Sequence, residues 1–279
     1  SQQSASLARL QDAMYKNQYD TDVTVWSPQG RLHQVEYAMK AVGLGSVTVG
    51  LRSNSHVVLA AVKKQTEELA SYSRKLQRIE ERVAIGVSGL TSDARSLAKY
   101  MRTECLQHRY VYGSCIQVGR LVKDVADKHQ RCTQSYVRRP YGVGLLVASC
   151  DTTGPRLFQT CPSGNYYEHY AHSIGARSQA ARTYLEKHFE AFPECSKEDL
   201  IEHAIKALAG CMAGDQEITA QCTEIGVIGV EEDYQMLSEA DIQSYLDRIE
   251  IQPAGAAAEE KGEGDDEDDA MEAEDAGAV

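Results

Sequence analysis

Apolar and polar residues alternate along this chain in blocks, and the period within a block is either that of a strand or that of a helix. The segment 27–30 (Ser-Pro-Gln-Gly) is typical of a tight turn, because proline stands second and glycine fourth. The turn opens a predicted helix over 31–42, which Gly43 and Gly45 are expected to end. The apolar face of this helix comprises Leu32, Val35, Met39 and Val42.

The remaining elements follow from the same two periods. Strands are predicted where apolar residues alternate with small or polar ones or form a short continuous run: 47–51, 56–63, 75–77, 83–88, 144–150, 156–161, 166–174 and 218–230. A second helix is expected to be capped by Thr91 or Ser92, with Asp93 in its first turn and an apolar face that reaches Cys105. Apolar spacings of three and four predict further helices over 118–131, 177–191, 197–212 and 239–248.

The order of these elements indicates the fold class. Strands are followed by two helices, more strands, two helices and again strands, without strict alternation of strand and helix. This order favours an α+β fold with two stacked antiparallel sheets and helix pairs on the outer faces, a four-layer αββα sandwich. A doubly wound parallel sheet would require a helix after each strand.

Charge divides the chain into three segments. Residues 1–13 are polar and without a sustained period, and are expected to be a disordered extension or residues foreign to the native protein. Residues 14–252 form the predicted domain, and residues 1–252 together carry 28 basic and 30 acidic side chains. Residues 253–279 hold eleven acidic side chains and one lysine, so most of the net charge of −12 lies in a predicted disordered acidic tail.

This distribution also limits the partners. The domain has no basic stripe that would attract phosphates, so a nucleic-acid partner is not expected. No apolar run approaches the roughly 18 residues that span a bilayer, and no membrane partner is expected. The eight cysteines form no CxxC pair and have no histidine at zinc-site spacing, which favours reduced, mostly buried thiols over a redox or metal role. We therefore expect no metal and no cofactor, in a protein of the cytoplasm and nucleus.

The motifs of common enzymes are weak or absent. A GxSxG nucleophile motif is missing, and Gly86-Val87-Ser88-Gly89 lacks the lysine of a phosphate-binding loop. His33 and Glu36 have the spacing of a metal pair, but a solvated or interfacial pair is the more ordinary interpretation. Motifs alone thus predict a soluble αββα domain and do not identify its function.

One segment carries a specific resemblance. Residues 19–38, which read YDTDVTVWSPQGRLHQVEYA, closely resemble the signature shared by proteasome alpha subunits. The resemblance continues through 88–95, 139–144 and 173–176, and covers about residues 15–248 in order. Three further segments, at Asn17-Gln18, at 158–163 and at 175–186, resemble one particular alpha type.

The resemblance implies the fold of N-terminal-nucleophile hydrolases, but without catalysis. Catalytic beta relatives expose an N-terminal threonine at the first strand, with an aspartate and a lysine nearby. Ser46 takes the place of that threonine and Val62 the place of the aspartate. Ser46 also follows 45 other residues, so it lacks the free amine that serves as base in such enzymes. No catalytic residue is therefore expected.

The resemblance instead implies a structural and gating subunit, acting in ubiquitin-dependent and ubiquitin-independent protein degradation. Its expected partners are neighbouring alpha subunits in a seven-membered ring, the beta ring, and the regulatory ATPases and other activators that dock through C-terminal tails. Helix 31–42 would contact the neighbours near the pore. Lys40 and Gly43 depart from the family's usual acid and lysine there, which suggests an altered neighbour preference.

Two groups of site residues follow from the same resemblance. Tyr19, Asp20, Pro28 and Tyr37 match the cluster that steadies the open gate. The pocket for activator tails is matched by Lys75, Gly45, Gly89, Leu90 and Leu32, with Lys75 pairing with the terminal carboxylate. Without the resemblance, Lys75 would be interpreted as a solvated lysine beside Arg74.

Two other functions remain open from the residues. A self-processed N-terminal hydrolase would be cleaved before Ser46, which mass spectrometry of the mature N-terminus would reveal. An acidic chaperone-like protein is suggested by the tail alone, and the size of the native particle would separate it from a ring subunit.

Overall fold

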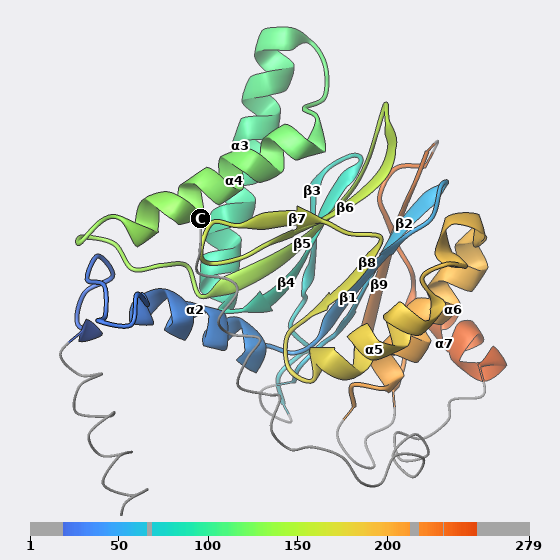
Figure 1. Cartoon of the computed structure of the whole chain (residues 1–279). Helices are drawn as coiled ribbons and strands as arrows, with labels where there is room; N and C mark the ends of the chain where they lie inside the picture. Colours follow the sequence, from blue (N-terminus) through green and yellow to red (C-terminus); the bar gives the residue numbers. More distant parts are fainter. Residues whose placement is uncertain (1–18, 66–68, 213–217, 231, 250–279) are drawn as a thin grey trace, which may run out of the picture.

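The computed structural model describes residues 19–65, 69–212, 218–230 and 232–249. The predicted segments 1–13 and 253–279 lie outside these residues, as do Asn17 and Gln18. Two five-stranded sheets lie face to face, and helices cover the outer face of each (Figure 1). The α+β four-layer sandwich expected from the order of elements is confirmed.

The elements have the following bounds. The helices are α2 (His33–Leu44), α3 (Thr91–Tyr112), α4 (Val118–Thr133), α5 (Ser178–His188), α6 (Lys197–Ala209) and α7 (Glu239–Arg248), with a short 3-10 helix η1 (Phe192–Glu194). The first sheet has the order β10-β9-β2-β1-β8, built from β10 (Gln235–Met236), β9 (Thr223–Gly229), β2 (His56–Val62), β1 (Thr48–Arg52) and β8 (Ala171–Ile174). The second has the order β3-β4-β5-β6-β7, built from β3 (Leu76–Glu80), β4 (Val83–Gly89), β5 (Val143–Asp151), β6 (Gly154–Thr160) and β7 (Tyr166–Glu168).

Three apolar cores separate the four layers. Val49 and Leu51 of β1 pack with Leu200 and Ile201 of α6 in the core under α5 and α6. A second core joins the other sheet to α3 and α4, and a third lies between the two sheets. Because each strand has residues facing each side in turn, the nearly continuous apolar runs of β2, β4 and β5 fit sheets that are covered on both faces.

Three details of the element boundaries differ from the prediction. Helix α2 continues through Gly43 to Leu44, and only Gly45 ends it. The N-cap residue of α3 is Leu90, not Thr91 or Ser92, and its side chain makes no capping hydrogen bond. Leu90 directly follows β4, and its backbone N–H donates to Gly142 O at 2.9 Å. The short strand β10 was not predicted, because its sequence shows no recognisable strand pattern.

The predicted strand over 166–174 is two strands in different sheets. Strand β7 pairs with β6, whereas β8 pairs with β1, so the chain crosses between the sheets at His169 and Tyr170. His169 donates its backbone N–H to Leu157 O, and Tyr170 O accepts the N–H of Arg52, which ties the crossing to both sheets. Neither glycine nor proline marks this change of sheet, so no local turn signal predicts it.

Within the described ranges, none of the helices has the length and apolar character needed to cross a membrane. The same part of the chain contains no group of three histidine, cysteine or acidic residues placed to hold a metal ion. All eight cysteines are free thiols, and Cys105, Cys132, Cys150 and Cys211 are buried.

Candidate functional site

The candidate site lies where α2 ends and β1 begins, and comprises Gly45, Ser46, Lys75, Ser88 and Gly89; we call it the β1 corner. Ser88 Oγ donates to Val42 O at 3.0 Å and lies 3.2 Å from Ser46 O, which joins the end of β4 to the end of α2. Three segments far apart in sequence therefore meet at one point.

Glycines allow this close approach. A Cβ added to Gly45 would clash with the backbone nitrogen of Gly89 and lie 2.5 Å from Ser88 Oγ. Gly175 directly follows β8 and has φ +105°, and a Cβ added to it would clash with Ser46 O. Ala176 donates its N–H to Gly45 O at 2.7 Å. Larger residues would force the segments apart.

Lys75 is buried at this corner with 8% of its surface exposed, so the interpretation of a solvated lysine is wrong. Its ammonium donates to the carbonyl oxygens of Ser46 and, at 3.3 Å, of Val47. Burial lowers the pKa of the Lys75 amine to about 7, and the negative charge of Glu224 partly opposes this shift. The amine can therefore gain or lose a proton near neutral pH.

Ser46 lacks the partners of a nucleophile. It is joined to Gly45 by a peptide bond, so its nitrogen is an amide and cannot act as a base. Val62 ends β2 and donates its backbone N–H to Val47 O at 3.1 Å, which places an isopropyl group where the resemblance expects a carboxylate in a catalytic relative.

Two of the four predicted gate residues are in contact. Tyr37 on α2 donates its hydroxyl to Asp20 Oδ2 at 3.0 Å, and Gln34 Nε2 donates to Asp20 O. Partial burial and then the Asp20 carboxylate raise the pKa of Tyr37, so the hydroxyl keeps its proton. Gln34 was missed, although it stands on the same helix face one turn before Tyr37.

Tyr19 and Pro28 make no hydrogen bond to Asp20 or Tyr37 in the described structure, and their place in the gate cluster stays a prediction. Tyr19 is half-buried and adjacent to Asp20 in sequence, and Pro28 is exposed in the predicted turn. The turn itself forms as predicted, since Gly30 donates its N–H to Ser27 O at 2.9 Å and has φ +76°.

The predicted pocket residues separate into two places. Gly45, Lys75 and Gly89 belong to the β1 corner, and Leu90 follows Gly89 with 46% of its surface exposed. Leu32 precedes the first residue of α2, whereas Gly45 follows the last, so a helix length of roughly 20 Å separates them. Leu32 therefore does not adjoin Lys75 within the chain, and its assignment to the pocket stays a prediction.

The family comparisons match this architecture. The family model described as "Proteasome subunit" matches residues 42–228, and a second model, of the N-terminal signature of alpha-type proteasome subunits, matches residues 19–41. The chain belongs to the proteasome alpha-subunit family.

Curated relatives extend the agreement beyond the family models. "Proteasome subunit alpha type-1" of Dictyostelium discoideum is 50% identical over 85% of this chain and 96% of the relative. "Probable proteasome subunit alpha type-6" of Schizosaccharomyces pombe is 48% identical over 88% and 90%. "Proteasome subunit alpha type-1" of Drosophila melanogaster is 46% identical over 84% and 85%. Type 1 is also the alpha type that the segments at 17–18, 158–163 and 175–186 resemble.

An ion pair that sequence patterns did not reveal braces the β1 corner of this alpha-family chain. Arg139 donates to both carboxylate oxygens of Asp93 at 2.7 and 2.8 Å, and Gly142 donates its N–H to Asp93 Oδ2 at 3.0 Å. Hydrogen bonding from Arg139 is the main reason that the pKa of Asp93 is lowered. Because Gly142 O accepts the N–H of Leu90, this clamp holds the segment that carries Gly89 and Leu90.

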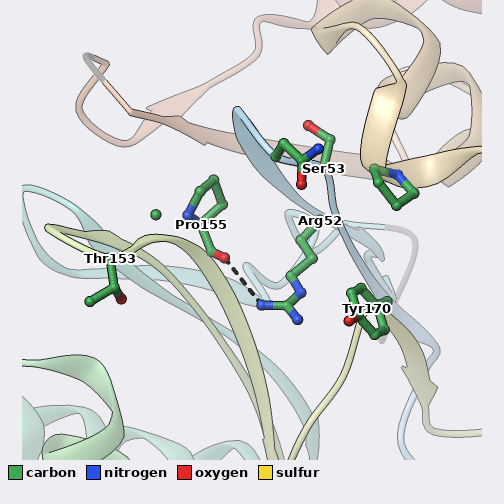
Figure 2. A pocket seen from close by; sticks show the side chains of 8 residues that line it. Arg52, Ser53, Thr153, Pro155 and Tyr170 are labelled. Carbon is green, nitrogen blue, oxygen red and sulfur yellow. Dashed lines mark hydrogen bonds between the residues drawn. The ribbon is translucent and has the colours of Figure 1, made fainter.

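A cavity of about 270 Å³ lies elsewhere in the molecule, and Figure 2 shows its lining. Arg52 stands at the far end of β1, roughly 20 Å from Ser46 along the strand. Its guanidinium already donates to Pro155 O and Glu168 Oε1 and lies 4.5 Å from the centre of the Tyr170 ring. The cavity therefore contains none of the predicted site residues, and its cation is already paired.

Proposed function

We propose that this chain is a non-catalytic structural and gating subunit of the outer alpha ring of the 20S proteasome, acting in the cytoplasm and nucleus. In this role it takes part in protein degradation, both ubiquitin-dependent and ubiquitin-independent. The observation that carries the proposal is the β1 corner, where the residue in the nucleophile position lies within the chain and a buried lysine contacts its carbonyl. A self-processed hydrolase is the alternative, and would show a mature N-terminus at Ser46.

Assembly into a seven-membered ring, seated on the beta ring, is supported by exposed apolar side chains near α2. Leu44 is 85% exposed, Trp26 61% and Met39 44%. Apolar side chains of this size that are exposed in one chain can be covered by a protein partner. We propose that neighbouring alpha subunits cover them.

The absence of catalysis can be tested at Ser46. Ser46→Ala is expected to leave each peptide-hydrolysing activity of the assembled particle unchanged, because the serine has no free amine and no carboxylate at Val62. Lys75 is the group of the corner that can accept a proton at neutral pH, so the test is not trivial. Loss of one cleavage specificity from an intact particle would establish the hydrolase instead.

The gate is proposed to be steadied by the contact between Tyr37 and Asp20, together with Tyr19 and Pro28. Tyr37→Phe removes a hydrogen bond worth about 1 kcal/mol and keeps the ring of the side chain. Peptide entry stimulated by an activator is therefore expected to fall by roughly fivefold, whereas hydrolysis by detergent-opened particles should be retained. Tyr110→Phe, a 92% exposed tyrosine on α3, is the matched control. An equal loss under both conditions would indicate an assembly defect.

Lys75 is proposed to bind the terminal carboxylate of an activator tail. An ammonium has three hydrogen-bond donors, and two are directed to the carbonyl oxygens of Ser46 and Val47. The third remains for an incoming carboxylate. Leu90, which is exposed, and the half-buried Gly45 bring the corner to the surface of the molecule. Regulatory ATPases and other activators would thus dock between this chain and a neighbour.

Lys75→Ala tests this docking. A charge-assisted bond is worth about 1.5–3 kcal/mol, so a free C-terminal tail peptide is expected to bind this pocket about ten- to a hundredfold more weakly. A photo-crosslinkable peptide, with the yield measured on this chain, isolates the pocket from the others in the ring. The exposed Lys123, paired with Asp127 on α4, provides the control Lys123→Ala.

Amidation of the peptide's C-terminus should mimic the mutation. If Lys75 binds the terminal carboxylate, amidation and Lys75→Ala combined should lower the affinity for the peptide little more than either change alone. Fully additive losses would mean that the lysine contacts another part of the peptide. An intact activator should lose less affinity than the peptide, because several tails dock at once.

A further inference from the structure

A buried acid on the opposite sheet holds the segment that carries Lys75. Glu224 lies in β9 and has 4% of its surface exposed. Its Oε2 accepts the backbone N–H of Lys75 at 2.8 Å and that of Leu76 at 3.0 Å. These two bonds fix the start of β3, and so the point from which the Lys75 side chain extends to the β1 corner.

The direction of Glu224 is unusual for a charged residue. Its neighbour Ile225 and, two residues on, Val227 belong to the core under α5 and α6, so Glu224 faces the layer between the sheets. Its cross-strand partner Ala61 belongs to that inter-sheet core. A carboxylate in such a layer is costly unless it is hydrogen-bonded and paired with a charge.

Lys75 supplies the opposite charge. Among the described residues, Glu224 is the charged group that favours the ammonium form of Lys75 against burial. Tyr234 also faces Glu224, since the carboxylate contributes, after burial, to raising the pKa of the Tyr234 hydroxyl to about 12. Arg74 is exposed and acts on Tyr234 in the opposite sense. Tyr234 therefore stays neutral near pH 7, and the local charge balance rests on Glu224 and Lys75.

We propose that Glu224 is a positioning residue that keeps Lys75 in place and favours its ammonium form, and thereby sets the pH range over which a partner's terminal carboxylate binds at the β1 corner. The inference rests on the proposed docking function of Lys75. Neither the acid nor its bonds touch the incoming tail. Glu224 acts through the lysine.

The direction of the pH dependence follows from the lysine's chemistry. An amine is charged below its pKa, and the pKa of Lys75 is about 7. A terminal carboxylate stays ionised down to about pH 4. Docking should therefore strengthen as the pH falls from about 8 to about 6, and the amidated peptide should not show this trend.

Glu224→Gln separates charge from shape. Glutamine keeps the volume and a carbonyl oxygen that can accept both N–H groups, but it removes the negative charge. The pKa of Lys75 should then fall by about one unit. In assembled particles the crosslinking yield of the free-acid peptide should drop on the order of tenfold at about pH 8, and less than about twofold at about pH 6. Glu232→Gln, a half-buried acid paired with Lys197, is the control.

A second measurement makes the two hypotheses distinguishable. Trace acetylation of the intact particle by acetic anhydride, quantified on Lys75 by mass spectrometry across pH, reports the charge of the amine without any docking. The labelling midpoint is expected near pH 7 in the wild type and lower in Glu224→Gln.

Each outcome then has a distinct meaning. If Lys75→Ala abolishes docking but Glu224→Gln shifts neither docking nor the labelling midpoint, the role of Glu224 is overturned and the docking function stands. If Lys75→Ala leaves docking unchanged while Glu224→Gln shifts the midpoint, docking at Lys75 is overturned, and with it the link from Glu224 to binding. A wild-type midpoint near the value of a free lysine, about pH 10, would overturn the proposed change in docking between about pH 6 and about pH 8 without any variant.

Discussion

Replacing Gly89 by alanine is expected to reduce the free energy of unfolding by roughly 3 kcal/mol or more and to exclude most of the variant chain from assembled particles. Gly89 has φ +110°, a conformation that residues with a Cβ avoid. An added Cβ would also clash with Gly142 O and lie 3.1 Å from Val143 Cα. Both obstacles are backbone atoms at the start of the neighbouring strand β5, so they cannot move aside as a side chain would.

Gly119→Ala is the matched control for this prediction. Gly119 lies in α4, and a Cβ added there would meet only the ring of Phe158, at 4.0 Å. Alanine in a helix interior is favoured over glycine by about 0.5–1 kcal/mol, so this variant should be neutral or slightly more stable. The two variants would be compared by thermal unfolding of the particle and by the fraction of the chain incorporated. Equal melting temperatures would contradict the strain assigned to Gly89.

Local patterns predicted the layers because each layer has its own period. Strands β2, β4 and β5 are apolar throughout because both of their faces are buried. Helices α3 and α4 show apolar residues at helical spacing because each buries one face. The crossing at His169 and Tyr170 was not predicted. The chain changes sheet there because β7 and β8 pair with strands of different sheets, and no local residue marks that change.

The candidate site was reached by resemblance and completed by contacts across the fold. The resemblance to proteasome alpha subunits singled out Asp20, Tyr37 and Lys75. The structure then showed the contact between Asp20 and Tyr37 and the burial of Lys75. The two partners that matter most to the β1 corner could not be found in this way. Glu224 is 149 positions from Lys75, and Asp93 is 46 positions from Arg139. Pairings at such separations follow from sheet topology, which a single sequence does not encode locally.

The separation of Leu32 from Lys75 has a geometric cause. One chain cannot bring together residues at opposite ends of the same helix, whereas a pocket formed between two subunits could include both. Within this chain Leu32 and Gly45 stay at opposite ends of α2. A signature therefore identifies the residues of such a site without stating which of them share a chain.

Asp93→Ala is expected to lower the free energy of unfolding by about 2–4 kcal/mol. The side chain of Asp93 is 10% exposed, and it accepts both bonds from Arg139 and the N–H of Gly142. Its removal leaves that buried N–H without its partner. It also removes a negative charge from the first turn of α3. Arg139 is 62% exposed and can be solvated, which keeps the loss below that of a fully buried pair.

The pH dependence of this loss distinguishes the charge from the shape of Asp93. Its pKa is lower in the folded chain than in the unfolded chain, chiefly because of Arg139, so the stabilisation is present above about pH 4 and disappears as the pH falls through the folded value. The difference in melting temperature between wild type and Asp93→Ala should therefore narrow below about pH 4. Asp127→Ala, which removes an exposed partner of Lys123 on α4, should cost less than about 1 kcal/mol. A loss at Asp93 that stayed constant as the carboxylate became protonated would show that packing, and not the ion pair, holds the segment carrying Gly89 and Leu90 against α3.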